Sequence, residues 1–391
     1  MTDEFMQYAQ SLKNQKLFET EALYQSAPAI CLPHFQDNFC DVCKNILKMQ
    51  HNGLSGEISF LEYTLLRTNL MQKKSVAEVR AYHDKWYFDG RQYIAGYFDF
   101  SPFFVRYWEL AKELAASRKR FPGVSAQEIT AFVLSCADSF YRYVISACRF
   151  FILNCIDTEP FLSLQRADEF VISAGEYMAC SEPIYQENRK RTAQEALEWF
   201  ASRLKYDYTY ESFAGLNFSH ADLSEINLDY TDFRNAALTG ADFRNARLTG
   251  ARFCGADLTD ADFRGCLLHE ADFRGAQLRG ARFASARAFR GVSQNQNWTD
   301  AGYRSVNFRN ADLSHADFRN ADILDADFTG AVMESTLLLK EQLGQFLLSP
   351  QQKQTVCTAD EMPVEADLAQ TSLNGSRSST PQKGSTAWIT L

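Results

Sequence analysis

Residues 241–265 read ADFRNARLTGARFCGADLTDADFRG, and a large apolar residue recurs in this stretch at every fifth position. The same period extends in both directions along the chain. A period of five fits neither the 3.6-residue repeat of a helix nor the two-residue repeat of a strand. The recurring positions are Phe213, Phe218, Leu223, Leu228, Phe233, Leu238, Phe243, Leu248, Phe253, Leu258, Phe263, Leu268, Phe273, Leu278 and Phe283, then Trp298, Tyr303, Phe308, Leu313, Phe318, Ile323, Phe328 and Met333.

The repeated unit Ala-Asp-Phe-x-x resembles the pentapeptide-repeat family, whose consensus is A(D/N)LXX, and the resemblance covers residues 211–335. It implies a right-handed quadrilateral parallel β-helix with four pentapeptides per coil. In such a solenoid the central Phe or Leu and the Ala two places before it point inward, where a large and a small side chain together fill a narrow core. Gly or Asn closes many units, as expected at corners that need unusual backbone angles.

The alternation of Phe and Leu breaks after residue 284. With twenty residues per coil, Phe233, Phe253 and Phe273 fall on one side, but Phe308 falls on a former Leu side. Removing either five or fifteen residues restores the alternation, so we expect a loop over 284–297. A continuous coil with poor core residues is the alternative. Loops on rigid scaffolds concentrate binding residues, and the residues predicted to contact a partner are Arg287, Arg290, Gln294 and Asn297.

Residues 1–208 show signals that are typical of helices. Ser75-Val76-Ala77-Glu78 and Ser125-Ala126-Gln127-Glu128 match the capping box, and Ser101-Pro102 matches an N-cap followed by Pro at the first helical position. We expect an all-α domain with helices over 4–24, 36–50, 57–72, 76–88, 102–119, 126–155, 164–180 and 184–205. The segment 82–108 is unusually rich in aromatic residues, which we expect in the core, with an exposed aromatic groove as the alternative.

The predicted organisation is multidomain. It comprises an all-α domain over 1–208, a β-helix over 209–335, a capping helix over 336–348 and a disordered tail over 349–391. The ends of a β-helix expose apolar core and unpaired backbone, so both ends need a cover. We expect the helix over 192–205 to cover the first coil. In proteins that the repeat resembles, a C-terminal cap also carries dimerisation, which implies a homodimer through the helix over 336–348 as one candidate assembly.

Composition and charge restrict the classes of protein to consider. The chain has 391 residues and a formal net charge of −9, which argues against direct binding of nucleic acid or of a membrane surface. The first residues, MTDEFMQYAQ, lack the basic and apolar regions of a secretory signal, and the most apolar stretch, 144–156, is too short to span a bilayer. The ten cysteines are scattered and fit reduced thiols. We therefore expect a cytoplasmic protein.

Catalytic and metal-binding signals are weak. One interpretation of Cys31, His34, Cys40 and Cys43 is a zinc site. The alternative is a helix that presents its thiols to a core. The chain contains no GxGxxG, GxxxxGK[ST], HExxH or GxSxG motif. We expect no enzyme, no cofactor and no catalytic, cofactor-binding or metal-binding residues.

The remaining hypotheses concern binding. Some members of the family that the repeat resembles protect type II topoisomerases by presenting an acidic rod that imitates duplex DNA. Residues 211–335 contain 18 acids and 13 arginines, yet between 247 and 290 eight arginines outnumber five acids. A basic belt in the middle of the rod is poorly suited to DNA imitation. The leading hypothesis is a non-enzymatic, bacterial-type interaction or scaffold protein whose partner is another protein. Gyrase protection and delivery into a host cell as an effector are the alternatives.

Overall fold

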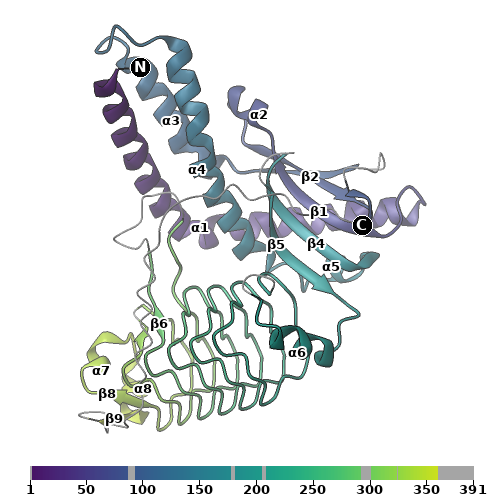
Figure 1. The fold of residues 1–391 in the computed structure, drawn as a ribbon, viewed down its shortest axis with the longest axis vertical. Helices are drawn as coiled ribbons and strands as arrows, with labels where there is room; N and C mark the ends of the chain where they lie inside the picture. Colours follow the sequence, from purple (N-terminus) through teal and green to yellow (C-terminus); the bar gives the residue numbers. More distant parts are fainter. Residues whose placement is uncertain are drawn as a thin grey trace.

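The structure, a computed structural model, describes residues 2–86, 93–177, 181–204, 208–291, 301–323 and 325–359. It has two parts: an N-terminal part of helices and a β-sheet, and a C-terminal rod of stacked coils (Figure 1). The N-terminal part lies along one flank of the rod, with its long helices projecting away from it.

Helix α1 (Asp3–His51) is 49 residues long and contains Pro28 and Pro33. Each proline removes a backbone donor and crowds the preceding turn, which bends a helix. Figure 1 shows that the first half of α1 runs beside the other long helices while its second half passes behind the sheet. The two helices predicted over 4–24 and 36–50 are therefore one bent helix. Among the described residues, no helix is both long enough and apolar enough to cross a bilayer.

The other helices of the N-terminal part are α2 (Arg67–Met71), α3 (Ser101–Ser117), α4 (Ala126–Ile152), α5 (Glu159–Leu162) and α6 (Ala193–Ala201). Both the Ser125/Glu128 capping box of α4 and a Thr192/Glu195 box at α6 are formed. The predicted helical character of this region is confirmed for these segments.

The prediction of an all-α domain is wrong, because a five-stranded sheet runs through the N-terminal part. Its strand order is β3-β2-β1-β4-β5, with β1 and β4 parallel and the other neighbours antiparallel. The strands are β1 (Ile58–Leu65), β2 (Val76–Tyr82), β3 (Tyr93–Asp99), β4 (Arg166–Glu176) and β5 (Ser181–Asn188). They replace most of the helices predicted over 57–72, 76–88, 164–180 and 184–205.

Local sequence explains the error at β2. The stretch VAEVRAY alternates buried Ala77, Val79 and Ala81 with half-buried residues between them, which is the two-residue period of a strand. The apparent capping residue Ser75 instead donates its hydroxyl to Asp99 Oδ1 at 2.7 Å, across the β2–β3 pair. The capping-box pattern therefore wrongly predicted a helix here, because pairing of β2 with β3 stabilises a strand instead.

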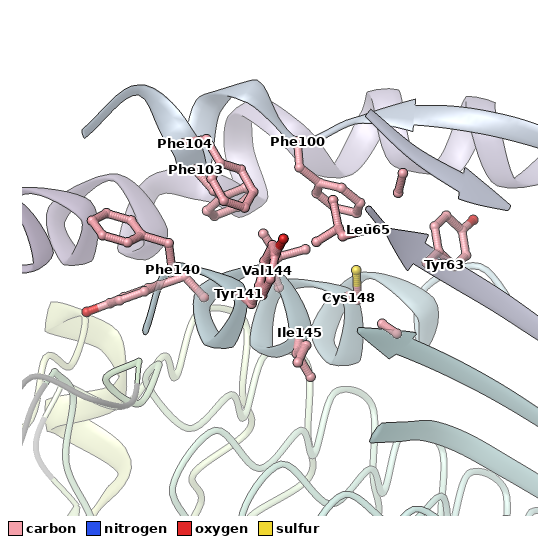
Figure 2. Close-up of a cluster of buried hydrophobic side chains, with 14 of the residues drawn as sticks. Tyr63, Leu65, Phe100, Phe103, Phe104, Phe140, Tyr141, Val144, Ile145 and Cys148 are labelled. Carbon is pink, nitrogen blue, oxygen red and sulfur yellow. The ribbon is translucent and has the colours of Figure 1, made fainter. Parts of the chain in front are cut away.

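The core of the N-terminal part lies between the sheet and the long helices. Figure 2 shows Phe100, Phe103 and Phe104 above α4, which contributes Phe140 and Val144 from below. These side chains are at most 1% exposed. The aromatic segment therefore serves mainly as core, as the first of the two interpretations predicts, although residues 87–92 lie outside the described part of the chain.

The rod is a β-solenoid built from parallel bridges between residues twenty positions apart. One ladder joins Ser212, Asp232, Arg252 and Asp272, and equivalent ladders begin at Asn217, Asp222 and Asn227. Four pentapeptides therefore make one coil. Successive coils are separated by ~4.8 Å, the spacing of hydrogen-bonded strands.

The central aromatic residues stack from coil to coil inside the rod. Phe243 and Phe263 lie 4.9 Å apart between ring centres with an interplanar angle of 4°. After the coil of Phe273 the offset between paired residues grows from 20 to 35, since Asp272 pairs with Asn307, and Phe308 stacks on Phe273 at 5.0 Å. Fifteen extra residues therefore lie between Ala288 and Asn307. Of the two loop lengths considered, fifteen is confirmed, and the insertion starts later than predicted.

Corners of the rod use a backbone conformation that favours glycine. Gly265 has φ of +72°, and a Cβ placed there would lie 2.3 Å from Asn245 Oδ1 of the preceding coil. Asn245 itself has φ of +58°, so an asparagine in one coil packs over a glycine in the next. Both the conformation and the contact therefore select glycine at this corner.

The C-terminal end of the rod differs from the predicted capping helix over 336–348. The short strands β6 (Arg287–Ala288) and β7 (Asp322–Ile323) pair within the rod, and beyond them lie β8 (Leu337–Leu339), α7 (Gln342–Gln345), α8 (Pro350–Thr355) and β9 (Cys357–Ala359). Leu338 continues the stack of inward residues, so the segment extends the ladder instead of forming one long helix. The predicted disorder is wrong for 350–359, while 360–391 lie outside the described residues.

Two glutamines close this end. Gln342 Nε2 donates to the carbonyl oxygens of Phe318 and Ala321, both at 2.9 Å, and Gln352 Nε2 donates to those of Phe328 and Ala331 at 2.8 and 3.0 Å. Phe346 and Leu348 join the apolar core of the rod. Side-chain amides thus satisfy backbone acceptors that would otherwise be left unpaired at the end of a ladder.

At the other end the sheet and the rod share one ladder. Gln186 of the edge strand β5 bridges Glu211 in parallel, with Gln186 N donating to Tyr210 O and Ser212 N donating to Gln186 O, both at 2.9 Å. Ala196 and Phe200 of α6 belong to the core of the rod, as predicted for the first cover. The two parts are therefore joined by backbone hydrogen bonds as well as by the chain.

Candidate interaction surfaces of the rod

The four sides of the rod are named here by their inward residues. These are side 1 (Phe213, Phe233, Phe253, Phe273, Phe308, Phe328), side 2 (Phe218, Leu238, Leu258, Leu278, Leu313, Met333), side 3 (Leu223, Phe243, Phe263, Phe283, Phe318, Leu338) and side 4 (Leu228, Leu248, Leu268, Ala288, Ile323). The residues immediately before and after each central residue point outward, so they decide what each side presents to a partner.

Aspartate and arginine on either side of a central Phe form ion pairs within one unit. Arg244 Nε and Nη2 donate to both carboxylate oxygens of Asp242 at 2.6 to 3.0 Å. The hydrogen bond from Arg244 holds the pKa of Asp242 below its usual value. The same arrangement joins Arg234 to Asp232, Arg264 to Asp262, Arg274 to Asp272 and Arg319 to Asp317. Much of the acidic charge of the rod is thus neutralised locally.

The N-terminal part covers side 1 over the first coils of the rod. Arg234 on this side forms ion pairs with Asp232 and with Asp157, which follows α4. The carboxylate of Asp232 is fully buried, whereas that of Asp242 on side 3 is 27% exposed. Further along, Arg252 donates to the carbonyl oxygen of Leu153.

The corner between sides 4 and 1 holds a buried arginine from α4. Arg149 lies 5.3 Å from the ring centres of both Tyr210 and Tyr230, which stack on each other at 5.4 Å, and it pairs with Glu182 on β5. Arg149 thus contacts the sheet and two successive coils at once.

The insertion contacts α1 near its bend. Gly302 N donates to Glu21 Oε2 at 2.9 Å, and Gln25 Nε2 donates to Tyr303 O at 3.1 Å. The guanidinium of Arg304 lies between the rings of Tyr24 and Phe150, 4.2 and 4.3 Å from their centres. The described part of the insertion therefore connects the two parts of the molecule instead of extending into solvent.

A buried histidine lies beside the insertion on side 4. His269 is 5% exposed, and its ring stacks on Tyr303 with centres 4.4 Å apart. The backbone N–H of Phe289 donates to His269 Nδ1 at 3.1 Å. Burial, followed by the charges of Arg287 and Arg247, lowers the pKa of His269 to about 4. Phe289 and Tyr303, near the two ends of the insertion, thus shield this histidine.

The repeat geometry agrees with a comparison with known families. The family model described as pentapeptide repeats matches residues 217–253, 246–284 and 304–336, in eight copies. The repeat region of this chain belongs to the pentapeptide-repeat family. The gap between the matched segments, 285–303, lies where the fifteen extra residues interrupt the ladder.

Solved structures of other pentapeptide-repeat proteins match about a third of the chain. QnrB1, a plasmid-mediated fluoroquinolone resistance protein, is 24% identical over 34% of this chain and 71% of that chain, with a TM-score of 0.27. Rfr23 from the cyanobacterium Cyanothece 51142 is 17% identical over 36% and 97%, with a TM-score of 0.21. HetL from Nostoc sp. strain PCC 7120, involved in heterocyst differentiation regulation, is 24% identical over 38% and 81%, with a TM-score of 0.14. No curated protein sequence matched significantly.

Of the four predicted partner-binding residues, the structure describes two, Arg287 and Arg290. Arg287 belongs to β6 and is exposed, so it lies in the ladder and not in a loop. Arg290 is exposed, and its Nε donates to Gln25 Oε1 at 3.3 Å. Gln294 and Asn297 lie outside the described residues. Binding of a partner by these residues stays a prediction.

The candidate zinc ligands lie far apart along α1. Cys31 and Cys43 are twelve residues apart in one helix, which separates them by about 18 Å along its axis. Burial raises the pKa of both thiols, which disfavours the thiolate that zinc requires. Within the described residues, no group of three His, Cys, Asp or Glu side chains is arranged to hold a metal ion. The geometry thus favours the core-packing interpretation of these cysteines.

Proposed function

We propose that this is a non-enzymatic protein-interaction or scaffold protein, in which sides 2 and 3 of the rod receive a protein partner. The observation that carries the proposal is the unequal covering of the four sides. On side 1 the Asp232–Arg234 pair is buried beneath the N-terminal part, whereas on side 3 the equivalent Asp242–Arg244 pair is exposed, with 52% of the Arg244 side chain accessible.

The chemistry of the free sides supports binding over catalysis. On side 2, Thr259 donates its hydroxyl to Asp257 Oδ1 at 2.7 Å, and Ser314 donates to Asp312 Oδ1 at 2.6 Å. Polar side chains that already hydrogen-bond to one another on a rigid ladder need little reordering when a partner binds. This lowers the entropic cost of association. We also infer the right-handed winding that is implied by the family resemblance.

Photo-crosslinking with the full-length chain tests the proposal. A benzophenone amino acid is placed at Arg244 on side 3, at Thr259 on side 2 and, as control, at Lys74 in an exposed turn of the N-terminal part. We expect one discrete protein adduct from the rod positions in cell extract and none from Lys74. Adducts that form equally at all three positions, or at none, would exclude the rod as the partner surface.

Imitation of DNA is a weaker candidate, since it requires a row of uncompensated acidic charges. Asp242 and Asp262 on the free side 3 each carry a bidentate arginine, so the row is locally neutral. Relief of fluoroquinolone inhibition of gyrase at near-equimolar protein would reverse this preference. Light scattering would test the homodimer through the C-terminal segment, and a host-cell pull-down would test the effector hypothesis.

A further inference from the structure

One coil departs from the Asp–Arg pairing of side 3. In the coils directly before and after it, Asp262 and Asp317 precede the central Phe and bind the arginine two positions further on. In the coil between them, residues 281–285 read ARFAS, so Arg282 replaces the aspartate and Ala284 replaces the arginine. Parallel bridges place Arg282 directly between Asp262 and Asp317 in the ladder.

A second unmatched arginine, Arg287, lies on side 4 of the same coil. Arg282 and Arg287 are both exposed, and within the described residues neither forms an ion pair. Asp322 occupies the position of Arg287 in the next coil but forms no ion pair with it in the described part of the chain. The corner residue between the arginines, Ser285, is also exposed and has φ of +61°. We name Arg282, Ser285 and Arg287 the arginine patch.

Neighbouring acids are not available to neutralise the patch. Asp262 accepts hydrogen bonds from Arg264 Nε and Nη2 at 2.6 to 3.0 Å, and Asp317 accepts from the corresponding atoms of Arg319 at 2.7 and 2.9 Å. Both carboxylates are thus already bound in a bidentate manner, which is the strongest geometry for a guanidinium. Within the described residues, neither arginine of the patch is therefore neutralised by an ion pair.

The pKa of the nearby His269 side chain is lowered by burial and in part by the charge of Arg287. Burial is the main cause that lowers the pKa of His269, but Arg287 is the largest charge acting in the same direction, ahead of Arg247. Arg247 is paired with Asp229 at 2.5 Å, so Arg287 is the uncompensated one of the two. The charge of Arg287 therefore acts on the side of the rod where His269 lies.

We propose that the arginine patch binds carboxylate side chains of an acidic segment of a protein partner. The proposal rests on the proposed function and names the chemistry of the partner. Two guanidinium groups on adjoining sides of one coil can each take a carboxylate with two parallel hydrogen bonds. The rigid ladder behind them fixes their separation, so the patch selects for the spacing of two acidic residues.

A nucleic acid fits the patch less well than an acidic peptide. Polyanion binders rely on many phosphate contacts along an extended basic path. Here Asp262 and Asp317 flank Arg282 at ~4.8 Å spacing along the rod, and Asp322 follows Arg287. The basic area is therefore one coil high and bordered by acids, which suits one or two carboxylates.

Fluorescence anisotropy with the full-length chain tests this inference, using a fluorescein-labelled decamer of glutamate as the probe. At low ionic strength we expect saturable binding that R282D/R287D weakens at least about fivefold, since two exposed ion pairs are lost and replaced by repulsion. R282K/R287K should retain most of the binding. The control R279D/R309D makes the same change in net charge at exposed arginines of sides 2 and 1, and should change binding less than twofold.

Several results would overturn the inference. These are equal losses in the two reversed-charge variants, absence of saturable binding to the peptide, or tighter binding of a ten-residue oligo-dT. Thermal unfolding of every variant checks that the exposed substitutions leave the fold intact. Failure of the patch would leave the crosslinks from Arg244 and Thr259 unchanged, whereas failure of the proposed function would remove them. The two failures are thus distinguishable.

Discussion

The guanidinium of Arg304, in the inserted segment of the rod, lies 4.2 Å from the centre of the Tyr24 ring on helix α1. Its backbone N–H donates to Glu270 Oε1 at 2.8 Å, and a side-chain nitrogen donates to Tyr24 O at 3.5 Å. Burial raises the pKa of Glu270, and the charge of Arg304 opposes that shift. One arginine thus joins the insertion to the N-terminal part while compensating a buried carboxylate.

Arg304→Ala should lower the free energy of unfolding by about 3 kcal/mol, because it leaves Glu270 buried without its compensating charge. The variant raises the pKa of Glu270 further, so Glu270 in the folded state takes up a proton more readily. The loss of stability caused by the substitution should therefore shrink as the pH falls. Urea unfolding at pH 8 and pH 5 measures both effects. Arg309→Ala, at an exposed arginine 3.8 Å from Asp327, is the control. Equal losses in the two variants would contradict the assignment.

Phe263→Ala should destabilise the rod by about 3 to 5 kcal/mol, the cost of deleting a buried aromatic ring. Phe263 is fully buried, between Phe243 at 4.9 Å and Phe283 at 5.0 Å. The adjacent substitution Arg264→Ala removes one ion pair at a 43% exposed side chain and should cost less than about 1 kcal/mol. Similar melting temperatures for the two variants would refute the inward and outward assignment.

His269 should make the protein less stable in acid. Its pKa is lowered to about 4 in the folded state, so the unfolded chain binds a proton first as the pH falls below about 6.5. The lost stability should approach about 3 kcal/mol by pH 4. In His269→Asn the side-chain oxygen can still accept from Phe289 N but cannot titrate. The stability difference between wild type and this variant should therefore change with pH between 7.5 and 4, and a constant difference would disprove the prediction.

Gly265→Ala should cost more than Gly275→Ala. Both glycines have positive φ, +72° and +65°, so both variants carry the backbone strain of about 1 kcal/mol. Only at Gly265 would the new methyl group meet Asn245 Oδ1, at 2.3 Å, while at Gly275 nothing lies within 4 Å. Thermal unfolding of the two variants side by side isolates the contact. If Gly275→Ala is the less stable variant, the corner packing described here is incorrect.

The sequence allowed the rod to be predicted in detail because its repeat is strictly local. Each unit places its own large residue inward, so counting in fives placed Phe233, Phe253 and Phe273 on one side, and their rings stack there. The broken alternation after residue 284 narrowed the insertion to five or fifteen residues. Which length applies depends on where the ladder resumes, and that is set by the pairing of Asp272 with Asn307, a contact between distant residues.

The sheet of the N-terminal part was missed for the opposite reason. Strand β1 is buried on both faces, with seven of its eight residues buried, and such a short apolar run does not separate strand from helix by period. Strand β2 did carry a two-residue alternation, but the Ser75/Glu78 pattern was given more weight. The junction of Gln186 with Glu211 pairs backbone atoms, so side-chain patterns carry no signal for it.

That junction has a mechanical consequence. The backbone hydrogen bonds between coils run along the axis of the rod, and the same ladder continues through Glu211 into β5. Tension applied at the C-terminal end would therefore be transmitted coil by coil into the sheet through this ladder. A partner held on the free sides of the rod would keep a fixed distance and orientation with respect to anything bound by the N-terminal part.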